Sequence, residues 1–344
     1  MIELEFLLSH EMISLIGEID EFKGSWKALK NLKPEALNSL KHVATIESIG
    51  SSTRIEGVKL SDSEIEKLLK GIKTHSFSSR DEEEVAGYSE VMELIFSSFN
   101  ELEFSENHIK QLHQILLKFS SKDIRHRGEY KKLSNNVEAF DLEGKSLGII
   151  FKTATPFETP AKMEELLNWV NETLKSKTIH PIIVLSIFAV QFLAIHPFQD
   201  GNGRLSRILT TLFMLKTGYE YVPYSSLEKV VEENKTEYYL SLRQAQTKPE
   251  IDMGIWVLFF LKMLKKQKDN LAIKLNKEHF LMRLPQLSEA ILKEIKERGF
   301  ITISEIELIT KANRNTIKLR LKELVRSGLI ELSGKGKSAK YISR

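Results

Sequence analysis

Twelve consecutive residues, HPFQDGNGRLSR from His196 to Arg207, contain the side chains that chemistry on a phosphate group requires. His196 follows an apolar stretch, and its imidazole can accept a proton near neutral pH. Asp200 offers one hard carboxylate, which is enough for a Mg²⁺ ion that takes its other ligands from water and phosphate. The segment therefore predicts a general base close to a metal ligand.

The other residues of this segment are suited to binding an anion. Gly201, Asn202 and Gly203 open the next helix with backbone N–H groups that no bulky side chain covers, which makes an anion-binding nest. Arg204 and Arg207 lie three residues apart in the first turn and add two guanidinium groups suited to phosphate oxygens. The combination predicts a site for phosphate chemistry.

Four histidines outside this segment are interpreted as structural. A lone His before Pro usually caps a helix, and we interpret His180 in this way. His42, His108 and His113 are interpreted as lacking partners that would recommend them for a functional role.

Helical elements must position these residues, because helical periodicity is common in the chain and strand-like alternation is scarce. We therefore expect a mainly α fold. The apolar run Ile182–Ile195 directly precedes His196, and Ser186 and Gln191 interrupt it. It is too short for a membrane span and predicts a buried helix. The run ILTTLFML, residues 208–215, predicts a second helix after the motif.

We expect three parts along the chain of 344 residues: an N-terminal helical region (1–84), a catalytic domain (85–277) and a C-terminal module (278–344). In the middle part, Gly144 and Gly148 separate short apolar runs, which predicts a β-hairpin around Val137 to Lys152.

The C-terminal module resembles a winged helix-turn-helix domain, with three helical segments followed by alternation across a Gly-Lys-Gly-Lys turn. Its last sixty residues carry thirteen Lys or Arg and seven Asp or Glu, a balance of +6. Because the whole chain has a net charge of +3, the other 284 residues sum to −3. A basic module on a nearly neutral body is thus expected.

The composition indicates a soluble globular protein, with 42% hydrophobic and 28% charged residues. The absence of cysteine excludes disulfides and Cys-ligated zinc. Glu3, Glu5 and Glu11 stand where an export signal would be basic and apolar, so we expect a cytoplasmic protein without a membrane anchor.

The segment from His196 to Arg207 resembles the Fic family motif, HPF-x-[DE]-GNGR-x-x-R, at every specified position. Two flanking segments are also similar to that family: RGEYKK, residues 127–132, which resembles the entry to the flap, and TPFETPAKMEELLNWV, residues 155–170, which resembles the segment after it. The resemblance covers roughly Val85 to Met263. It implies a Fic-type helical core in which the β-hairpin is a flap that aims the target.

The resemblance also implies a reaction, the transfer of AMP from ATP to a Ser, Thr or Tyr hydroxyl of a target protein or of the chain itself. His196 would deprotonate the hydroxyl, and Asp200 would hold Mg²⁺ between the α- and β-phosphates. The residues implied in ATP binding are Gly201, Asn202, Gly203, Arg204, Leu205, Ser206, Arg207 and Tyr239.

Two positions refine this picture. The Doc-like kinase branch of the family has Lys in place of Gly203, so the glycine favours nucleotidyl transfer over phosphorylation. Gln246 stands where some relatives have an Asn that contacts the nucleotide. Homodimers are common in the family, and the sequence leaves the oligomeric state open.

The stretch SSTRIEG, residues 51–57, ends an amphipathic helix, and Gly57 predicts a helix stop. Glu56 faces the negative end of the helix dipole, where a cation would be favoured. Ser52-x-x-x-Glu56-Gly57 resembles the inhibitory motif [ST]-x-x-x-E-[GN] of the same family. The resemblance implies that Glu56 pairs with Arg207 and blocks the place of the γ-phosphate, with Ser52 fixing that end.

Two alternatives to an auto-inhibited adenylyltransferase follow from these residues. Within the enzyme class, Glu56 could position a water that removes AMP from a modified target. In another class, the protein would be a DNA-binding regulator with the Fic body as a nucleotide sensor. The cations offered for DNA are Arg314, Lys318, Arg320, Lys322, Arg326, Lys335 and Lys337.

Overall fold

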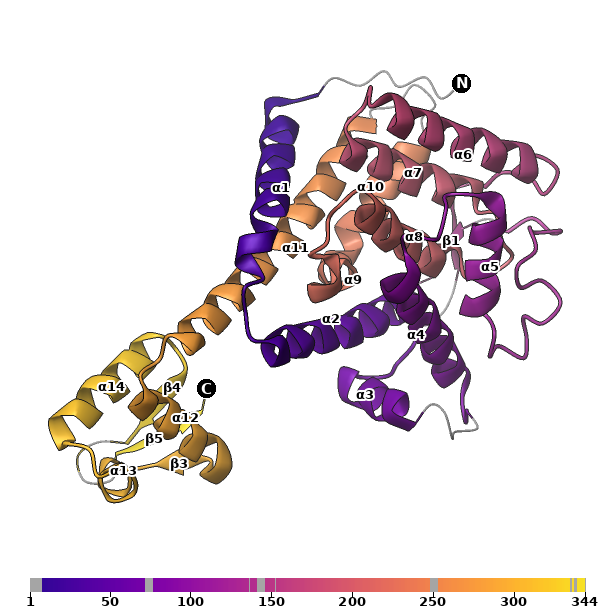
Figure 1. Cartoon of the computed structure of the whole chain (residues 1–344). Coiled ribbons are helices and arrows are strands. Elements are labelled where there is room, and N and C mark those ends of the chain that lie inside the picture. Colours follow the sequence, from indigo (N-terminus) through magenta and orange to yellow (C-terminus); the bar gives the residue numbers. More distant parts are fainter. Residues whose placement is uncertain are drawn as a thin grey trace. The chain divides into compact units, whose positions relative to one another are not determined.

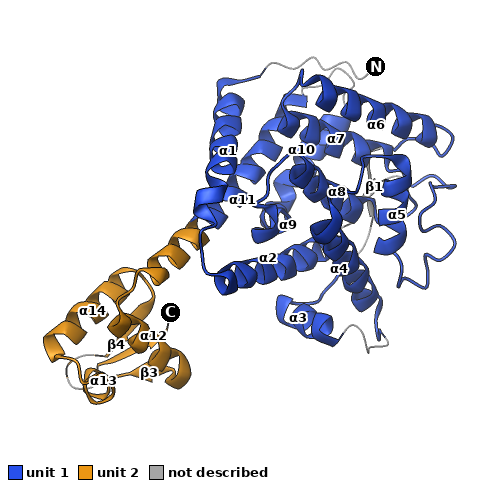
Figure 2. Cartoon of the chain, in the orientation of Figure 1, with its two compact units in different colours: residues 1–272 blue, residues 273–344 orange. Residues whose placement is uncertain are grey.

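The computed structural model describes residues 8–71, 77–135, 137–140, 146–151, 153–247, 253–334, 336 and 339–343. The chain divides into two compact units, Met1–Ala272 and Ile273–Arg344 (Figure 2). The region before residue 84 belongs to the same unit as the motif, and α4 (Arg80–Ser98) runs across the boundary expected there. The second division falls within α11 (Met253–Met282), a few residues before the boundary expected after 277.

The fold is mainly α, as predicted, and its elements are labelled in Figure 1. The remaining helices of the first unit are α1 (His10–Leu29), α2 (Pro34–Ile55), α3 (Asp62–Gly71), α5 (Glu106–Leu116), α6 (Thr159–Ser176), α7 (Pro181–Ile195), α8 (Asn202–Lys216), the short 3₁₀ helix η1 (Val222–Tyr224), α9 (Leu227–Glu233) and α10 (Lys235–Thr247).

Helix α7 forms the centre of the first unit. It begins after His180, whose ring accepts a hydrogen bond from the Ile182 N–H at 3.4 Å, so the predicted capping role of His180 is confirmed. Its residues are buried on all sides, because it packs against α6, α8 and α10. Each fully buried aliphatic or aromatic side chain stabilises the fold by about 1.5–3 kcal/mol relative to an exposed one. In the part of the chain that the structure describes, no helix is long and apolar enough to span a membrane.

Helix α2 packs with its C-terminal half against α9, η1 and α4. Small polar residues line this half, and Ser51, Ser52 and Thr53 are fully buried. Their size allows the neighbouring helices to approach closely. The helix ends at Ile55, and Gly57 has a φ of 107°, which confirms the predicted stop and explains the glycine, since L-residues rarely adopt that conformation.

The predicted hairpin is present as an antiparallel pair of strands. β1 (Val137–Phe140) pairs with β2 (Ser146–Phe151), with Val137 opposite Phe151 and Phe140 opposite Ser146. Residues 141–145 and Lys152 lie outside the described residues.

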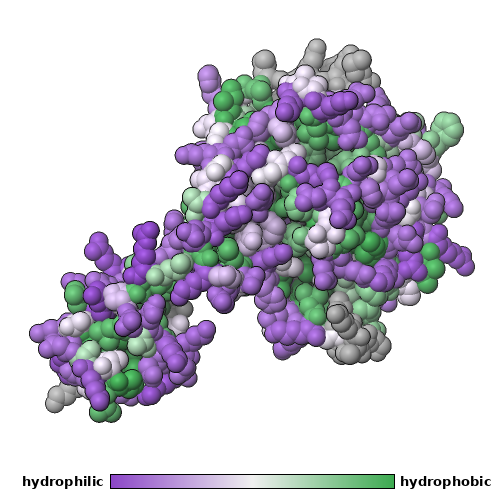
Figure 3. Space-filling view, viewed as in Figure 1, coloured by the Kyte–Doolittle hydropathy of each residue, from purple (hydrophilic) through white to green (hydrophobic). Residues whose placement is uncertain are grey.

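The second unit has a hydrophobic core of its own. Its elements are α12 (Gln286–Arg298), β3 (Phe300–Ile301), α13 (Ile303–Thr310), α14 (Arg314–Arg326), β4 (Ile330–Ser333) and β5 (Lys340–Ser343). The two strands predicted around the Gly-Lys-Gly-Lys turn are present as β4 and β5, and β3 joins them in a sheet of order β3-β5-β4. The core consists of Ile291, Ile295, Ile301, Ile306, Ile317, Leu321, Leu324 and Ile330. On the face shown in Figure 3, hydrophilic residues make up most of the surface of each unit.

Candidate active site

His196 lies at the junction between α7 and the motif loop, in a left-handed conformation with φ 52° and ψ 60°. Its Nδ1 lies 3.2 Å from the Leu193 carbonyl oxygen. Because a carbonyl only accepts, Nδ1 carries the proton, and the lone pair is on Nε2. Burial lowers the pKa of His196 to about 4, so the ring is neutral at pH 7 and can act as a base.

The loop after His196 is held by side-chain amides. Asn202 accepts a hydrogen bond from the Phe198 N–H at 2.9 Å and donates one to the Phe198 carbonyl at 2.7 Å. Asn135 donates to the same carbonyl at 2.6 Å. Asn202 is buried, and its amide is used within the loop. Its contribution to an anion nest is therefore its backbone N–H.

His113 on α5 supports the loop from the other side, and the interpretation that it lacks partners is wrong. Its Nδ1 accepts from the Gly128 N–H at 2.8 Å, which leaves Nε2 to donate to the Asp200 carbonyl at 3.0 Å. Its ring stacks on Phe198 with centroids 3.8 Å apart. Burial lowers the pKa of His113 to about 4, so it is held neutral. Both partners are distant in sequence, so no local pattern could have identified it.

Lys131 connects the base of the hairpin to α7. Its buried ammonium group donates to the Ile195 carbonyl at 2.9 Å, to Asn135 Oδ1 at 2.8 Å and to Thr153 Oγ1 at 3.0 Å. Its backbone N–H donates to the Pro197 carbonyl at 2.9 Å. Burial lowers the pKa of Lys131 to about 8. Both ends of the hairpin are thus attached to the segment that carries His196.

Asp200 lies in a network of alternating charges. Its Oδ1 accepts from the Gly201 N–H at 2.6 Å and lies 3.3 Å from Arg204 Nη2. Its Oδ2 lies 3.2 Å from Arg80 Nη2. Burial opposes ionisation, but the charges of Arg204 and Arg80 and the Gly201 N–H outweigh it and lower the pKa of Asp200.

Arg204 points into the protein, with a side chain that is 2% exposed. Its Nη1 lies 2.8 Å from Glu84 on α4, in addition to the contact with Asp200. In this arrangement Arg204 orients two carboxylates. Glu84 and Arg80 are further members of the site that sequence reasoning missed, because they precede the motif by more than a hundred residues.

Arg207 meets the C-terminal end of α2. Its Nη2 lies 2.6 Å from Glu56 Oε1 and donates to the Ser52 carbonyl at 3.0 Å, and its Nε donates to Ser52 Oγ at 2.8 Å. Desolvation alone would raise the pKa of Glu56, but the charge of Arg207 and its hydrogen bond outweigh it, so the pKa is lowered. The Glu56 carboxylate lies at the negative end of α2, where a cation is favoured. Arg207 of α8 supplies that cation.

Glu56 also lies over the start of α8. A Cβ atom built on Gly203 would be 2.2 Å from Glu56 Oε1, so the carboxylate is packed against the bare backbone of that glycine. The N-terminus of a helix is a favourable place for an anion. The Glu56 carboxylate therefore lies at the start of α8, where an anion is favoured.

Arg54 anchors the same end of α2 to α9 and α3. It binds Glu232 with two contacts of 2.8 and 3.0 Å and Asp62 with one of 2.8 Å. Lys235 adds a hydrogen bond of 3.0 Å from α10 to the Ile55 carbonyl. The residues next to Glu56 are therefore fixed to three other helices.

The other residues implied in ATP binding are placed in different ways. Leu205 is fully buried in the core and Ser206 is 3% exposed, so only their backbone is available to a nucleotide. Tyr239 is half-buried, and burial with the charge of Glu56 raises its pKa. Gln246 donates to the Val190 carbonyl at 3.3 Å. The neighbour Tyr238, which sequence reasoning did not select, is buried near Arg207.

The residues present fit one magnesium ion only if a nucleotide supplies ligands. In the described part of the chain no three His, Asp or Glu side chains form a metal-binding group. Asp200 provides one carboxylate, and its Oδ2 already attracts the cationic Arg80. Mg²⁺ commonly binds through one carboxylate plus water and substrate phosphates. Asp200 could hold the ion in this way.

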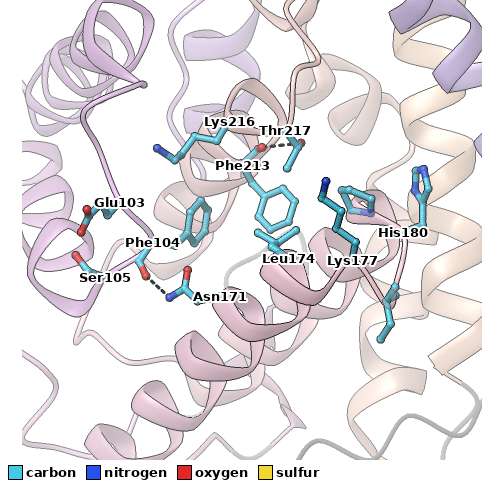
Figure 4. A pocket seen from close by; sticks show the side chains of 12 residues that line it. Glu103, Phe104, Ser105, Asn171, Leu174, Lys177, His180, Phe213, Lys216 and Thr217 are labelled. Carbon is cyan, nitrogen blue, oxygen red and sulfur yellow. Dashed lines mark hydrogen bonds between the residues drawn. The ribbon is translucent and has the colours of Figure 1, made fainter.

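A cavity of about 920 Å³ lies apart from the motif, among the ends of α5, α6, α7 and α8. Figure 4 shows the rings of Phe104 and Phe213 with Leu174 at its centre. None of the motif residues lines it.

The cations offered for DNA lie in the second unit. On α14, Arg314 forms an ion pair with Glu307, and Arg320 one with Glu323 at 2.8 Å. Lys335 and Lys337 lie outside the described residues. Two of the five cations on α14 are thus neutralised by carboxylates of the same unit. DNA binding stays a prediction.

Comparisons with known proteins agree with the motif. Residues 103–214 match the Fic/DOC family. The protein adenylyltransferase Fic of Drosophila virilis is 25% identical over 292 residues, which cover 82% of this chain and 56% of that protein. The chain thus spans about half the length of that relative.

Solved structures share the fold. A Fic family protein from Desulfovibrio desulfuricans G20 has a TM-score of 0.65 at 21% identity, covering 99% of this chain and 98% of that one. A Fic domain-containing signalling protein from Bacteroides thetaiotaomicron has a TM-score of 0.58 at 25% identity, covering 76% and 95%. The mainly α, Fic-type fold predicted from the sequence is confirmed.

Proposed function

This chain carries a Fic domain, and on that premise we propose that the protein is an auto-inhibited protein adenylyltransferase. The observation that carries the proposal is the position of Glu56, which pairs with Arg207 at 2.6 Å and covers the start of α8. An anion in this position would exclude the phosphates of ATP, which we propose bind at the start of α8. His196, which is neutral at pH 7, lies at the other end of the loop that leads into α8.

In the proposed reaction, His196 Nε2 accepts the proton of a target hydroxyl. The hydroxyl oxygen attacks the α-phosphorus of ATP, the bond to the bridging oxygen breaks, and pyrophosphate leaves with its electron pair. AMP remains on the protein. Positioning and charge neutralisation would supply most of the rate enhancement, as in other reactions at phosphorus.

The chain's own residues would share the binding of ATP. The N–H groups of Asn202 and Gly203 would face the phosphates, because the Gly201 N–H already donates to Asp200 Oδ1. Arg207 would bind the γ-phosphate once Glu56 has left it. Arg204 would keep Asp200 oriented, and Tyr239 would contact the nucleotide. Asp200 would hold Mg²⁺, which when bound would supply positive charge to the phosphates.

The hairpin would place the target. An extended segment could pair with an edge of the β1–β2 ribbon and present its hydroxyl to His196. The anchoring by Lys131 would keep that ribbon in register with the catalytic loop. The target could be another protein or a second copy of this chain.

The test is incubation with Mg²⁺ and ATP labelled at the α- or the γ-phosphate. Glu56→Gly should be labelled from α-labelled ATP more strongly than wild type, and not from γ-labelled ATP. His196→Ala in the Glu56→Gly background should remove the label. Mass spectrometry of the protein and of a lysate would identify the modified peptide.

The same assay separates the alternatives. Equal labelling of wild type and Glu56→Gly would contradict inhibition by Glu56. Transfer of the γ-label would indicate a kinase. Loss of AMP from premodified protein on adding wild type, but not Glu56→Gly, would indicate removal of AMP instead.

A further inference from the structure

We infer that Arg80 is an internal competitor of the divalent cation for Asp200, so that the metal must displace a residue of α4 before the site is complete. The inference rests on the proposed function in one respect, namely that Asp200 is the metal ligand. It adds a control of metal binding that is separate from the Glu56–Arg207 contact.

The two oxygens of Asp200 are used differently. Oδ1 accepts from the Gly201 N–H at 2.6 Å and faces Arg204 at 3.3 Å, so it is committed to the protein. Oδ2 is approached by Arg80 Nη2 at 3.2 Å. The oxygen that remains for a metal is therefore the one that Arg80 contacts.

Arg80 can leave this position, whereas Arg204 cannot. The Arg80 side chain is 52% exposed and that of Arg204 is 2% exposed. The Nε of Arg80 lies 2.7 Å from Glu84 Oε1, four residues along the same helix. When the terminal guanidinium nitrogen moves away from Asp200, the pair with Glu84 can remain, and the freed nitrogen turns towards water. The displacement needs a change of side-chain conformation and no movement of α4.

The metal and the guanidinium exclude each other by charge. Arg80 Nη2 lies 3.2 Å from Oδ2, so a divalent cation that used this oxygen would lie close to the guanidinium group, and the two positive charges would repel. Because Arg80 is half-exposed, solvent screens this interaction, and the effect on affinity is severalfold rather than a thousandfold.

The experiment measures binding of α,β-methylene ATP, which resists cleavage at the reacting bond, by isothermal titration calorimetry. The full chain is used in the Glu56→Gly background, once with Mn²⁺ and once with EDTA. The ratio of the two dissociation constants gives the metal enhancement. Arg80→Ala should increase this enhancement by about fivefold, the size expected for a partly screened ion pair.

Lys122→Ala is the matched control, because Lys122 is an exposed cation whose charge reaches Asp200 more weakly than that of Arg80. It should change the enhancement less than twofold, as expected for a screened charge without contact. An enhancement that is unchanged or smaller in Arg80→Ala would overturn the inference. Thermal unfolding of each variant shows that the comparison is made between folded proteins.

Asp200→Ala distinguishes a failure of the inference about Arg80 from a failure of the proposed metal ligand. If it abolishes the enhancement while Arg80→Ala has no effect, the inference fails and the proposed metal ligand stands. If the enhancement persists in Asp200→Ala, the metal assignment in the proposed function fails, and the inference fails with it.

Discussion

The carboxylate of Glu56 occupies the space in which a side chain on Gly203 would lie, since a Cβ there would be 2.2 Å from Oε1. Gly203 lies inside α8 and has no positive φ, so alanine would suit its backbone. The neighbouring carboxylate, and not the turn, is therefore what favours glycine at this position.

A double-mutant cycle tests this relationship. Gly203→Ala should destabilise the wild type by about 1–3 kcal/mol, because the new methyl group displaces Glu56. In the Glu56→Gly background the same change should stabilise by about 0.5–1 kcal/mol, because alanine favours a helix over glycine. Urea unfolding of the four proteins gives both values. The same sign in both backgrounds would show that Glu56 does not lie against Gly203.

Arg54 should maintain inhibition without touching the nucleotide. Arg54→Ala removes the contacts with Glu232 and Asp62, which releases the end of α2 that presents Glu56. We expect more labelling from α-labelled ATP than in wild type, and no added effect in Glu56→Gly. Ser39→Ala, at an exposed position of the same helix, is the control and should match wild type.

The rate of adenylyl transfer should depend little on pH near neutrality. The pKa of His196 is lowered to about 4, so the basic form is populated at every pH above that value. Measured in Glu56→Gly, the rate should be level from about pH 8 to pH 6 and fall only as the pH approaches 4. The negative charge of Glu56 raises the pKa of His196. Its removal in Glu56→Gly should therefore not move the pKa of His196 upward. A half-maximal rate near 6.5 would contradict the assignment.

His113 should make the protein sensitive to acid. Its pKa is lowered from 6.5 to about 4 by burial, so the unfolded chain binds a proton before the native protein does. The free energy of unfolding should therefore fall as pH decreases from 6.5 to about 4, by at most about 1.4 kcal/mol per pH unit for one such group.

His113→Phe keeps a ring next to Phe198 but cannot titrate. It should lower stability by about 2–4 kcal/mol at pH 7, because the Gly128 N–H and the Asp200 carbonyl lose their partner. It should also make the decline below pH 6.5 less steep than in wild type. An unchanged slope in denaturant titrations across that range would assign the acid sensitivity to other groups.

The sequence allowed the parts of this site that are close together to be predicted. His196, Asp200 and the glycines are neighbours in one segment. Their residue types and order predict a site for phosphate chemistry. The contact of Glu56 with Arg207 spans 151 residues and was reached only through resemblance to a family motif.

The rest could not be predicted because it depends on tertiary packing. His113 is 87 residues from Asp200, and its ring looks like any histidine on an amphipathic helix. Arg80 and Glu84 form an i,i+4 pair of a kind that is typical of a solvated helix surface. Only the packing of α4 against α8 brings this pair into contact with Asp200 and Arg204. Strand β3 has two residues, too few for a period to be recognised.

The charges of six side chains around Asp200 and Arg207 cancel. Three carboxylates face three guanidinium groups, namely Glu56, Glu84 and Asp200 with Arg80, Arg204 and Arg207. His196 adds none at neutral pH. In this resting state these six side chains together exert little long-range attraction on a polyanion such as ATP, so their electrostatic steering would contribute little to the association rate. Encounter with the nucleotide would then be nearly independent of ionic strength until one of these carboxylates turns away.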